Sequence, residues 1–538
     1  MSDVILFCPK TELDASENLA GFVESCRTGL TVFGSSLNFE SDVWDVTEFI
    51  SRKGFGDKHE RLVFSTLETA SAKSPKWMAD TFRPFAKAYI RYMHGLRPTK
   101  NIGFRLAALR ALEAALSENG QEPIPVRTDA HILNRSAQLI VDRYSEAAAY
   151  RIGGQLEMIA EFLADNRLTV VPTQWRNPIK RPGDAVRVGK QFDERRQEKM
   201  PTEAALDALP KVFRLAIDPA DVIVSSVAAI LCSAPDRINE VLILPVLCEV
   251  RQSAGKNKGD AYGLRWWPAK GANPMVKWIV PSMAGVVEEA ISKLREVTHE
   301  ARQIAKWYED HPEKVYLHKS VHHLRNVERL TMNQVAQIIG LPNEHSATGW
   351  CKGKNIEVHG QGAAKNTRFV DVERAIVAML PAGFPFLEKE TGLKYSDALL
   401  VTRTYELSSQ RASFRCMIEP ISIDQINDGL GSRVKHGVTS IFTRFAFTEP
   451  DGSPIKVTTH QFRHYLNTLA QAGGMSQLDI AKWSGRTDVR QNAAYDHMTS
   501  DQMLQKIRDA VGDDSKMFGP LAEIPKRVLI PRESLNKS

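Results

Sequence analysis

Apolar residues recur at helical spacing along most of the chain, which predicts a mainly α-helical protein with a small antiparallel β-sheet. The first clear stripe follows Trp77 and repeats every three or four positions as far as Met93, with Pro84 in the first turn. Further helices are predicted over 105–118, 129–140 and 145–163. Together they predict a four-helix block near the start of the chain.

The middle of the chain predicts two more helices and a hairpin. Residues 200–213 read as a helix capped by Thr202, and the almost wholly apolar run 222–231 reads as a buried helix. Two β-rich runs within 262–281 are separated by turn-forming residues that begin at Lys270. We therefore expect an antiparallel pair of strands there, with Trp266 packed in the sheet.

Residues 458–499 predict three short helices. Gly473 and Gly474 end the first, and Ser476 with Asp479 forms a capping pattern for the second, which ends at Gly485. The first helix should bury one apolar face, and His460 and Arg463 should project together from another face. That apolar face comprises Phe462, Tyr465, Leu466 and Leu469.

The third helix carries Tyr495, nine residues after Arg486. The ordered set His460, Arg463, Gly485 and Tyr495 resembles the closing motif of the tyrosine recombinase (phage integrase) family. That family has a His-x-x-Arg box, a Leu-Gly-His turn and a nucleophilic Tyr nine residues after the second His. Here Arg486 replaces that His, which is the main departure from the family pattern.

Two further positions fit the resemblance in chain order. Arg237, with Glu240 three residues later, matches the first catalytic Arg, although Pro235 stands where the family has Gly. An ordinary surface Arg–Glu pair is the alternative interpretation. Lys270, in the hairpin turn, matches the catalytic Lys, and Lys277 within the second strand is the alternative.

The resemblance implies a helical core-binding domain followed by a recombinase catalytic domain with a large insertion. We predict a region of unknown role over 1–75, the DNA-clamping helices over 76–171 and a basic linker over 172–200. A plain helical bundle is the alternative for the second region, and a solvated linker for the third. The linker residues expected to contact DNA are Arg176, Lys180, Arg181, Arg187 and Lys190.

The catalytic domain is predicted over 201–512, followed by a tail over 513–538. The 190 residues between Lys270 and His460 exceed the family's usual spacing and indicate an insertion over about 310–420. Residues 331–356 have the pattern of a helix-turn-helix, which is frequent by chance. Its role and the role of residues 1–75 stay open from the sequence.

Composition is consistent with these expectations but does not select among them. The chain has 538 residues, 43% hydrophobic and 25% charged residues and a net charge of +6, so several soluble domains are expected. The six cysteines lack paired spacing, and neither a signal pattern nor a long apolar run is present. We expect a cytoplasmic, nucleoid-associated protein with no membrane partner.

The predicted site can transfer a phosphoryl group without metal, ATP or another cofactor. Arg237 and Arg463 would hold the phosphate oxygens and Tyr495 would attack phosphorus. His460 can bond the phosphate or move a proton, and Lys270 can protonate the leaving 5′-oxygen. Arg486 is expected to replace the second His of the family, with Trp483 as the alternative.

The sequence thus predicts a site-specific recombinase or integrase of a mobile genetic element, acting on double-stranded DNA through a 3′-phosphotyrosyl intermediate. The resemblance implies a homo-tetramer on two duplexes, and leaves accessory proteins, the target site and the choice among integration, excision and transposition open. The alternatives are DNA relaxation of the type IB topoisomerase kind and a catalytically silent DNA-binding regulator.

Overall fold

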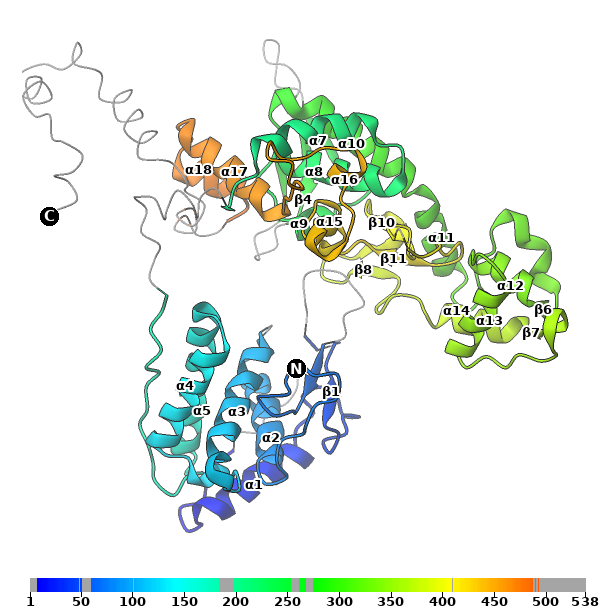
Figure 1. The fold of residues 1–538 in the computed structure, drawn as a ribbon. Coiled ribbons are helices and arrows are strands. Elements are labelled where there is room, and N and C mark those ends of the chain that lie inside the picture. Colours follow the sequence, from blue (N-terminus) through cyan, green and yellow to red (C-terminus); the bar gives the residue numbers. More distant parts are fainter. Residues whose placement is uncertain are drawn as a thin grey trace, which may run out of the picture. The chain divides into compact units, whose positions relative to one another are not determined.

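The computed structural model describes residues 7–47, 49–50, 60–99, 101–182, 198–252, 261–267, 274–408, 410–486, 489 and 492. These residues divide into two compact units, the first comprising the described residues up to 182 and the second those from 198 onward. Helices dominate both units, and the strands pair in small antiparallel sheets of two or three (Figure 1). The prediction of a mainly helical protein with antiparallel strands is confirmed, although the strands are spread over several sheets.

The predicted four helices form the body of the first unit. Every apolar residue of the first stripe is buried, and Pro84 lies in the first turn as predicted. Asp129 caps its helix by accepting a hydrogen bond from the backbone of Ile132 at 2.9 Å. These helices are α2 (Arg83–Leu96), α3 (Ile102–Leu116), α4 (Ala130–Arg143) and α5 (Glu146–Asp165).

The region before these helices packs into the same hydrophobic core. It contributes α1 (Ala15–Thr28) and the paired strands β1 (Val43–Asp45) and β2 (Arg61–Val63). The ring of Phe22, on α1, is fully buried and lies 5.5 Å from the ring of Tyr92 and 5.0 Å from that of Phe162. The N-terminal residues are therefore part of one folded body with α2–α5.

The chain that leaves α5 stays against the first unit as far as it is described. Trp175 is buried and its Nε1 donates to Oδ1 of Asn134 at 2.9 Å. Arg176, Lys180 and Arg181 on this segment are exposed. Arg187 and Lys190 lie outside the described residues.

The second unit is built around α8 (Pro219–Ser233), whose residues are buried along nearly its whole length. Thr202 caps α7 (Glu203–Leu215) as predicted, since its Oγ1 accepts from the backbone of Ala205 at 3.2 Å. The predicted hairpin is also present, and a third strand extends it in the order β3-β4-β5. The strands are β3 (Glu249–Gln252), β4 (Ala261–Trp266) and β5 (Met275–Trp278).

The remaining helices and strands complete the second unit, and part of the predicted insertion has a hydrophobic core of its own. No helix in the described part of the chain is both long and apolar enough to span a membrane. The helices are α9 (Ile238–Leu242), α10 (Pro281–Val297), α11 (His299–Asp310), α12 (Met332–Ile339), α13 (Glu344–Gly353), α14 (Phe369–Val377), α15 (Ile423–Gly429), α16 (Ile441–Arg444), α17 (Thr459–Ala472) and α18 (Gln477–Trp483), and the strands are β6 (Arg329–Thr331), β7 (Asn366–Arg368), β8 (Phe386–Glu388), β9 (Leu393–Lys394), β10 (Val401–Arg403) and β11 (Ile418–Pro420).

Candidate active site

Arg237 lies at the start of α9, where the sequence predicts it. Its backbone N–H donates to Oε2 of Glu240 at 3.0 Å, and its Nη1 donates to Oε1 of the same carboxylate at 3.0 Å. The carboxylate of Glu240 is fully buried, and the side chain of Arg237 is 17% exposed. The pair is therefore not the solvated surface pair that was the alternative, because a buried carboxylate orients one partly accessible guanidinium.

Lys277 and Asp236 form a buried ion pair next to Glu240. Both side chains are 1% exposed, and Nζ of Lys277 also lies 3.6 Å from Oε2 of Glu240. The same ammonium lies 4.2 Å from the centre of the Trp266 ring, whose Nε1 donates to Glu240 at 3.2 Å. Burial raises the pKa of Asp236 to about 7, and the attraction of Lys277 opposes that rise.

Lys277, which is only the alternative on sequence grounds, thus approaches the same Glu240 carboxylate as Arg237. Lys270, the lysine favoured from the sequence, lies outside the described residues. Its role as the general acid stays a prediction. Trp266 packs in the sheet as expected, and its indole also helps to hold Glu240.

Arg463 joins three segments that are far apart in the sequence. It lies on α17 and is 1% exposed. Its Nη1 donates to the carbonyl oxygen of Pro235, and its Nη2 donates to that of Ser484 at 3.1 Å. One guanidinium therefore connects α17 to the segment before Arg237 and to the end of α18.

The buried face of α17 is polar, so the predicted apolar face is wrong. Phe462 is buried, but Tyr465 and Leu466 are only partly buried and Leu469 is 49% exposed. Polar side chains can be buried when they have hydrogen-bond partners, and here neighbouring segments supply partners that helical spacing cannot reveal. The buried polar residues of this helix are Thr459, Arg463, His464, Asn467, Thr468 and Gln471.

Asn467 links this face to Arg486. Its fully buried Oδ1 accepts from Oγ of Ser484 at 3.0 Å and from Nη2 of Arg486 at 3.1 Å. Arg486 is 7% exposed, and its Nη1 donates to Oδ1 of Asn492. Arg486 is therefore turned into the protein and held by two asparagines, rather than directed to solvent.

His460 lies on the exposed surface of α17, one turn before Arg463. Its ring is 4.6 Å from that of His464 in an edge-to-face arrangement. Partial burial lowers the pKa of His460 below its ordinary value of 6.5, and the cations of Arg463, Arg237 and Lys199 lower it further. The neutral imidazole is therefore favoured at neutral pH, so it can accept a proton or a hydrogen bond.

The ends of the predicted helices in this region are confirmed. The first ends at Ala472, and Gly474 has a φ of +82°, a conformation that suits glycine. Oγ of Ser476 caps α18 by accepting from the backbone of Asp479 at 3.1 Å. Trp483, at the end of α18, packs partly buried against the core of the second unit. The predicted nucleophile, Tyr495, and the helix expected to carry it lie outside the described residues.

The described part of the site brings two arginines and a histidine together from segments more than 200 residues apart. Sequence reasoning missed Asp236 and Asn467, which hold this arrangement in place. Asn467 had a detectable signal. Arg463, Asn467 and Gln471 follow one another at intervals of four positions, which makes a polar stripe on one helical face. Asp236 had none, since its partner is 41 residues away.

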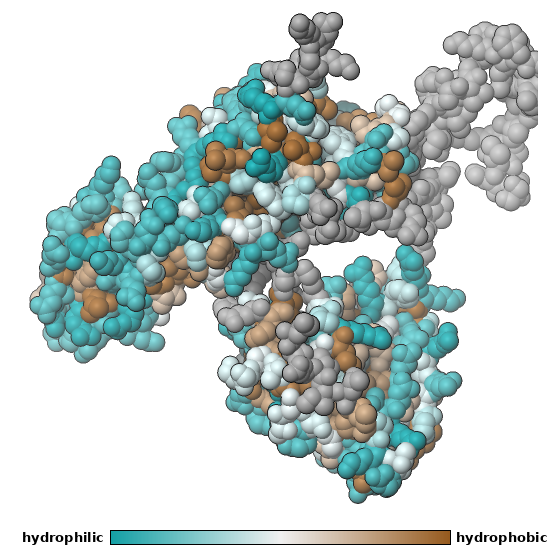
Figure 2. Space-filling view, turned by 180° about the vertical axis from the view of Figure 1, so that it is seen from behind, coloured by the Kyte–Doolittle hydropathy of each residue, from teal (hydrophilic) through white to brown (hydrophobic). Residues whose placement is uncertain are grey.

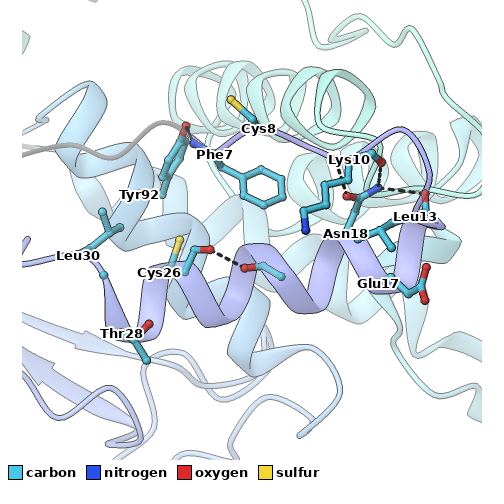
Figure 3. A pocket seen from close by; sticks show the side chains of 13 residues that line it. Phe7, Cys8, Lys10, Leu13, Glu17, Asn18, Cys26, Thr28, Leu30 and Tyr92 are labelled. Atoms are coloured by element: carbon cyan, nitrogen blue, oxygen red, sulfur yellow. Dashed lines mark hydrogen bonds between the residues drawn. The ribbon is translucent and has the colours of Figure 1, made fainter.

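No cluster of three or more His, Cys, Asp or Glu residues suited to a metal ion occurs among the described residues. A pocket of about 530 Å³ lies in the first unit, beside α1, and Phe7 and Tyr92 are among its lining residues (Figure 3). None of the predicted site residues lines it.

Comparison with known proteins yields distant structural likeness only. No protein-family model matches the chain, and no curated protein matches it. Two solved structures of the XerH site-specific recombinase, a pre-cleavage complex with its difH substrate and a post-cleavage complex with a palindromic difH substrate, each have a TM-score of 0.39 and 12% identity. These alignments cover 93% and 94% of this chain and 99% of each XerH chain.

A structure of the XerA recombinase has a TM-score of 0.22 and 12% identity, covering 80% of this chain and 98% of its own. The chain is thus similar in structure to these recombinases over most of its length, at low identity. At such TM-scores the likeness by itself assigns no function.

Proposed function

We propose that the chain is a site-specific tyrosine recombinase that cleaves and rejoins double-stranded DNA through a 3′-phosphotyrosyl intermediate. The observation that supports this most strongly is the junction made by Arg463. Its guanidinium bonds the carbonyls of Pro235 and Ser484, so the start of α9, α17 and the end of α18 meet at one point. Motif residues that the sequence sets far apart therefore lie within one small region.

The chemistry follows from the residue types and their surroundings. Oη of Tyr495 attacks the phosphorus of a phosphodiester, its proton passes to a base, and the bond from phosphorus to the 5′-oxygen breaks. Negative charge on the non-bridging oxygens is balanced by Arg237, the accessible arginine, with Arg463 holding the surrounding segments together. Neutral His460 beside them is suited to accept the tyrosyl proton or to bond the phosphate.

The leaving 5′-oxygen needs a proton, which we assign to Lys270. The 5′-hydroxyl of a second strand then attacks the phosphotyrosyl bond, releases Tyr495 and restores the phosphodiester. The reaction as proposed requires neither ATP nor a metal. By resemblance to the family, the working form is a homo-tetramer bound to two DNA duplexes. By the same resemblance, the protein is the recombinase of a mobile genetic element.

Capture of the covalent intermediate in cells tests this function and reveals the DNA site at the same time. The tagged full chain is expressed beside the DNA that flanks its gene, purified under denaturing conditions, and the DNA still attached is sequenced. We expect reads that begin at one short site for the wild-type chain and none for Tyr495→Phe. Tyr465→Phe is the matched control, because Tyr465 is a second tyrosine near the site and should leave the adduct intact.

The same experiment separates the alternatives. A wild-type chain that yields no adduct, but still retains that DNA under native conditions, would be a silent DNA-binding regulator. The main support for this alternative is that Arg486 stands where the family has its second His. Adducts that form without any exchange of flanking DNA would indicate relaxation of the type IB topoisomerase kind. An adduct that persists in Tyr495→Phe would show that another residue is the nucleophile.

A further inference from the structure

Part of the predicted insertion is a separately packed module within the second unit. Its core contains buried apolar residues from Val315 to Ile376 and from the returning segment 414–417. The hydroxyl of Tyr308, on α11, donates to the carbonyl of Cys416 at 2.7 Å and accepts from the backbone of Tyr316 at 3.2 Å, which fixes both ends of the module. The candidate active site needs none of these residues, so the module calls for a function of its own.

Two helices of the module form a helix-turn-helix. Thr331 and Gln334 make a capping box at the start of α12, and Asn343 caps α13. The turn between them begins at Gly340, which has a φ of +93°, and a Cβ there would lie 2.7 Å from the carbonyl oxygen of Ser413. A larger residue would be strained in this backbone conformation and would meet the Ser413 carbonyl, so the turn requires glycine.

The second helix keeps most of its surface free. α12 buries five of its eight residues, whereas α13 buries only Ala347 and Cys351 of its ten. His345 and Gly349, among others on α13, are exposed to solvent. A helix of this length, held by one narrow stripe and preceded by a buried helix, has the arrangement of a recognition helix that enters the major groove of DNA.

A short hairpin follows α13 directly. The backbones of His359 and Asn366 exchange hydrogen bonds of 2.8 and 2.9 Å, and β7 continues from there as the partner of β6. The tip, residues 360–364, is exposed. Gly360 has a φ of +82°, and a Cβ there would lie 2.6 Å from the carbonyl oxygen of Ala364, so this tip also requires glycine.

Free positive charge accompanies these two elements. Lys352 and Lys354 at the end of α13 are exposed, and Lys365 in the hairpin is partly exposed. None of the three forms an ion pair with another described residue. In sequence, the nearest acid is Glu357 for Lys352 and Lys354, and Asp371 for Lys365. By contrast, Arg368 and Arg374 both form ion pairs with Asp371 on α14. The face of the module drawn in Figure 2, at the left, is largely hydrophilic.

We propose that this module reads double-stranded DNA, with α13 in the major groove and the hairpin tip against the phosphate backbone beside it. His345 would face base edges, while Lys352, Lys354 and Lys365 would contact phosphates. The chain would thus recognise a DNA sequence through the module in addition to the DNA held at the active site. This binding requires no cleavage, so it stands apart from the proposed reaction.

The test is selection from a pool of random-sequence duplexes with the full-length protein, followed by affinity measurements over a range of salt. We expect the wild-type chain to enrich a sequence element that His345→Ala no longer enriches. Lys352→Gln with Lys354→Gln should weaken binding to the enriched duplex and reduce the slope of log affinity against log salt by about one for each phosphate that is no longer neutralised. The matched control is Lys314→Gln with Lys389→Gln, two exposed lysines outside α13 and the hairpin, which should retain the wild-type slope.

The proposal is overturned if His345→Ala enriches the same elements as the wild type and the α13 lysine variant keeps the wild-type slope. An equal loss in the control variant would also overturn it, since that result reports only total charge. Unfolding midpoints of all variants are compared with the wild type, and the single exposed change at His345 decides the matter if the double variant fails to fold. If the wild-type chain forms no covalent adduct at Tyr495 but gives the expected results in the selection and salt experiments, the proposed reaction is contradicted and this inference stands.

Discussion

Two lysines compete for the role of general acid, and their surroundings predict different behaviour. The 5′-alkoxide leaving group is a strong base, because its conjugate acid is about as weak as water, so it needs a proton as it leaves. When sulfur replaces the bridging 5′-oxygen, the leaving group is a thiolate whose thiol has a pKa of about 8.5, so it can leave without taking up a proton. Lys270→Ala should therefore cleave normal DNA slowly and sulfur-bridged DNA at near the wild-type rate.

Lys277→Ala should instead lose stability, because it leaves Asp236 buried without its ion-pair partner, whereas Glu240 keeps Arg237. Breaking a buried ion pair typically costs about 3–5 kcal/mol, which denaturant unfolding can measure. Combining it with Asp236→Asn should recover part of that loss. Normal stability of Lys277→Ala, with cleavage restored by the sulfur bridge, would transfer the role of general acid to Lys277.

His460 should titrate below the ordinary range for histidine. Burial and, after it, nearby cations disfavour its protonated form, so its folded pKa is below 6.5 and the ring stays neutral as the pH falls through that value. An NMR titration of its ring should show this lowered midpoint. Lys199→Gln removes one of those cations and should raise the midpoint, whereas Lys482→Gln on α18 removes an equal charge and should not. Equal midpoints in all three proteins would show that the charge of Lys199 does not act on His460.

At the scale of elements, α17 is held mainly by its polar face. Asn467 bonds Ser484, Arg486 and the backbone of Arg463, and it is fully buried. Asn467→Ala would remove the acceptor of the Ser484 hydroxyl and of Nη2 of Arg486, and a buried donor that loses its acceptor costs about 1–3 kcal/mol. We expect a clear fall in the free energy of unfolding and faster amide exchange in α18.

Leu469→Ala, on the same helix, is the matched control. Because Leu469 is 49% exposed, its truncation should change stability by no more than about 0.5 kcal/mol. The apolar face predicted from the sequence would give the reverse order. Denaturant unfolding of the two variants therefore distinguishes the polar face from the apolar one.

At the scale of the whole molecule, the two units have separate hydrophobic cores. The core of the first unit draws on residues from Phe22 to Trp175, and the main core of the second begins at Ala205. A fragment of residues 1–182 should therefore unfold cooperatively on its own, with a midpoint close to that of one transition in the full chain. Calorimetry of the fragment and the full chain measures this, and a fragment without a cooperative transition would contradict it.

Local chemistry determined much of this protein from the sequence alone. The helix caps at Thr202 and Ser476 and the glycine stop at Gly474 depend on contacts within a few residues, so their positions follow from sequence patterns. The pairing of β4 with β5 follows from alternation and a turn. His460, Arg463 and Tyr495 suggested the chemistry because they lie in one short stretch of the sequence, so their order and spacing can be read directly.

Tertiary structure decided which polar groups are buried. Helical spacing favoured Leu469 over Asn467 for the interior, but hydrogen-bond partners from α18 and the segment after it reversed that choice. The ion pair of Asp236 with Lys277 joins residues 41 positions apart, and Arg463 reaches Pro235 across 228. Burial of a charge is stable only when its partner is present, and no local pattern in the sequence says where that partner lies.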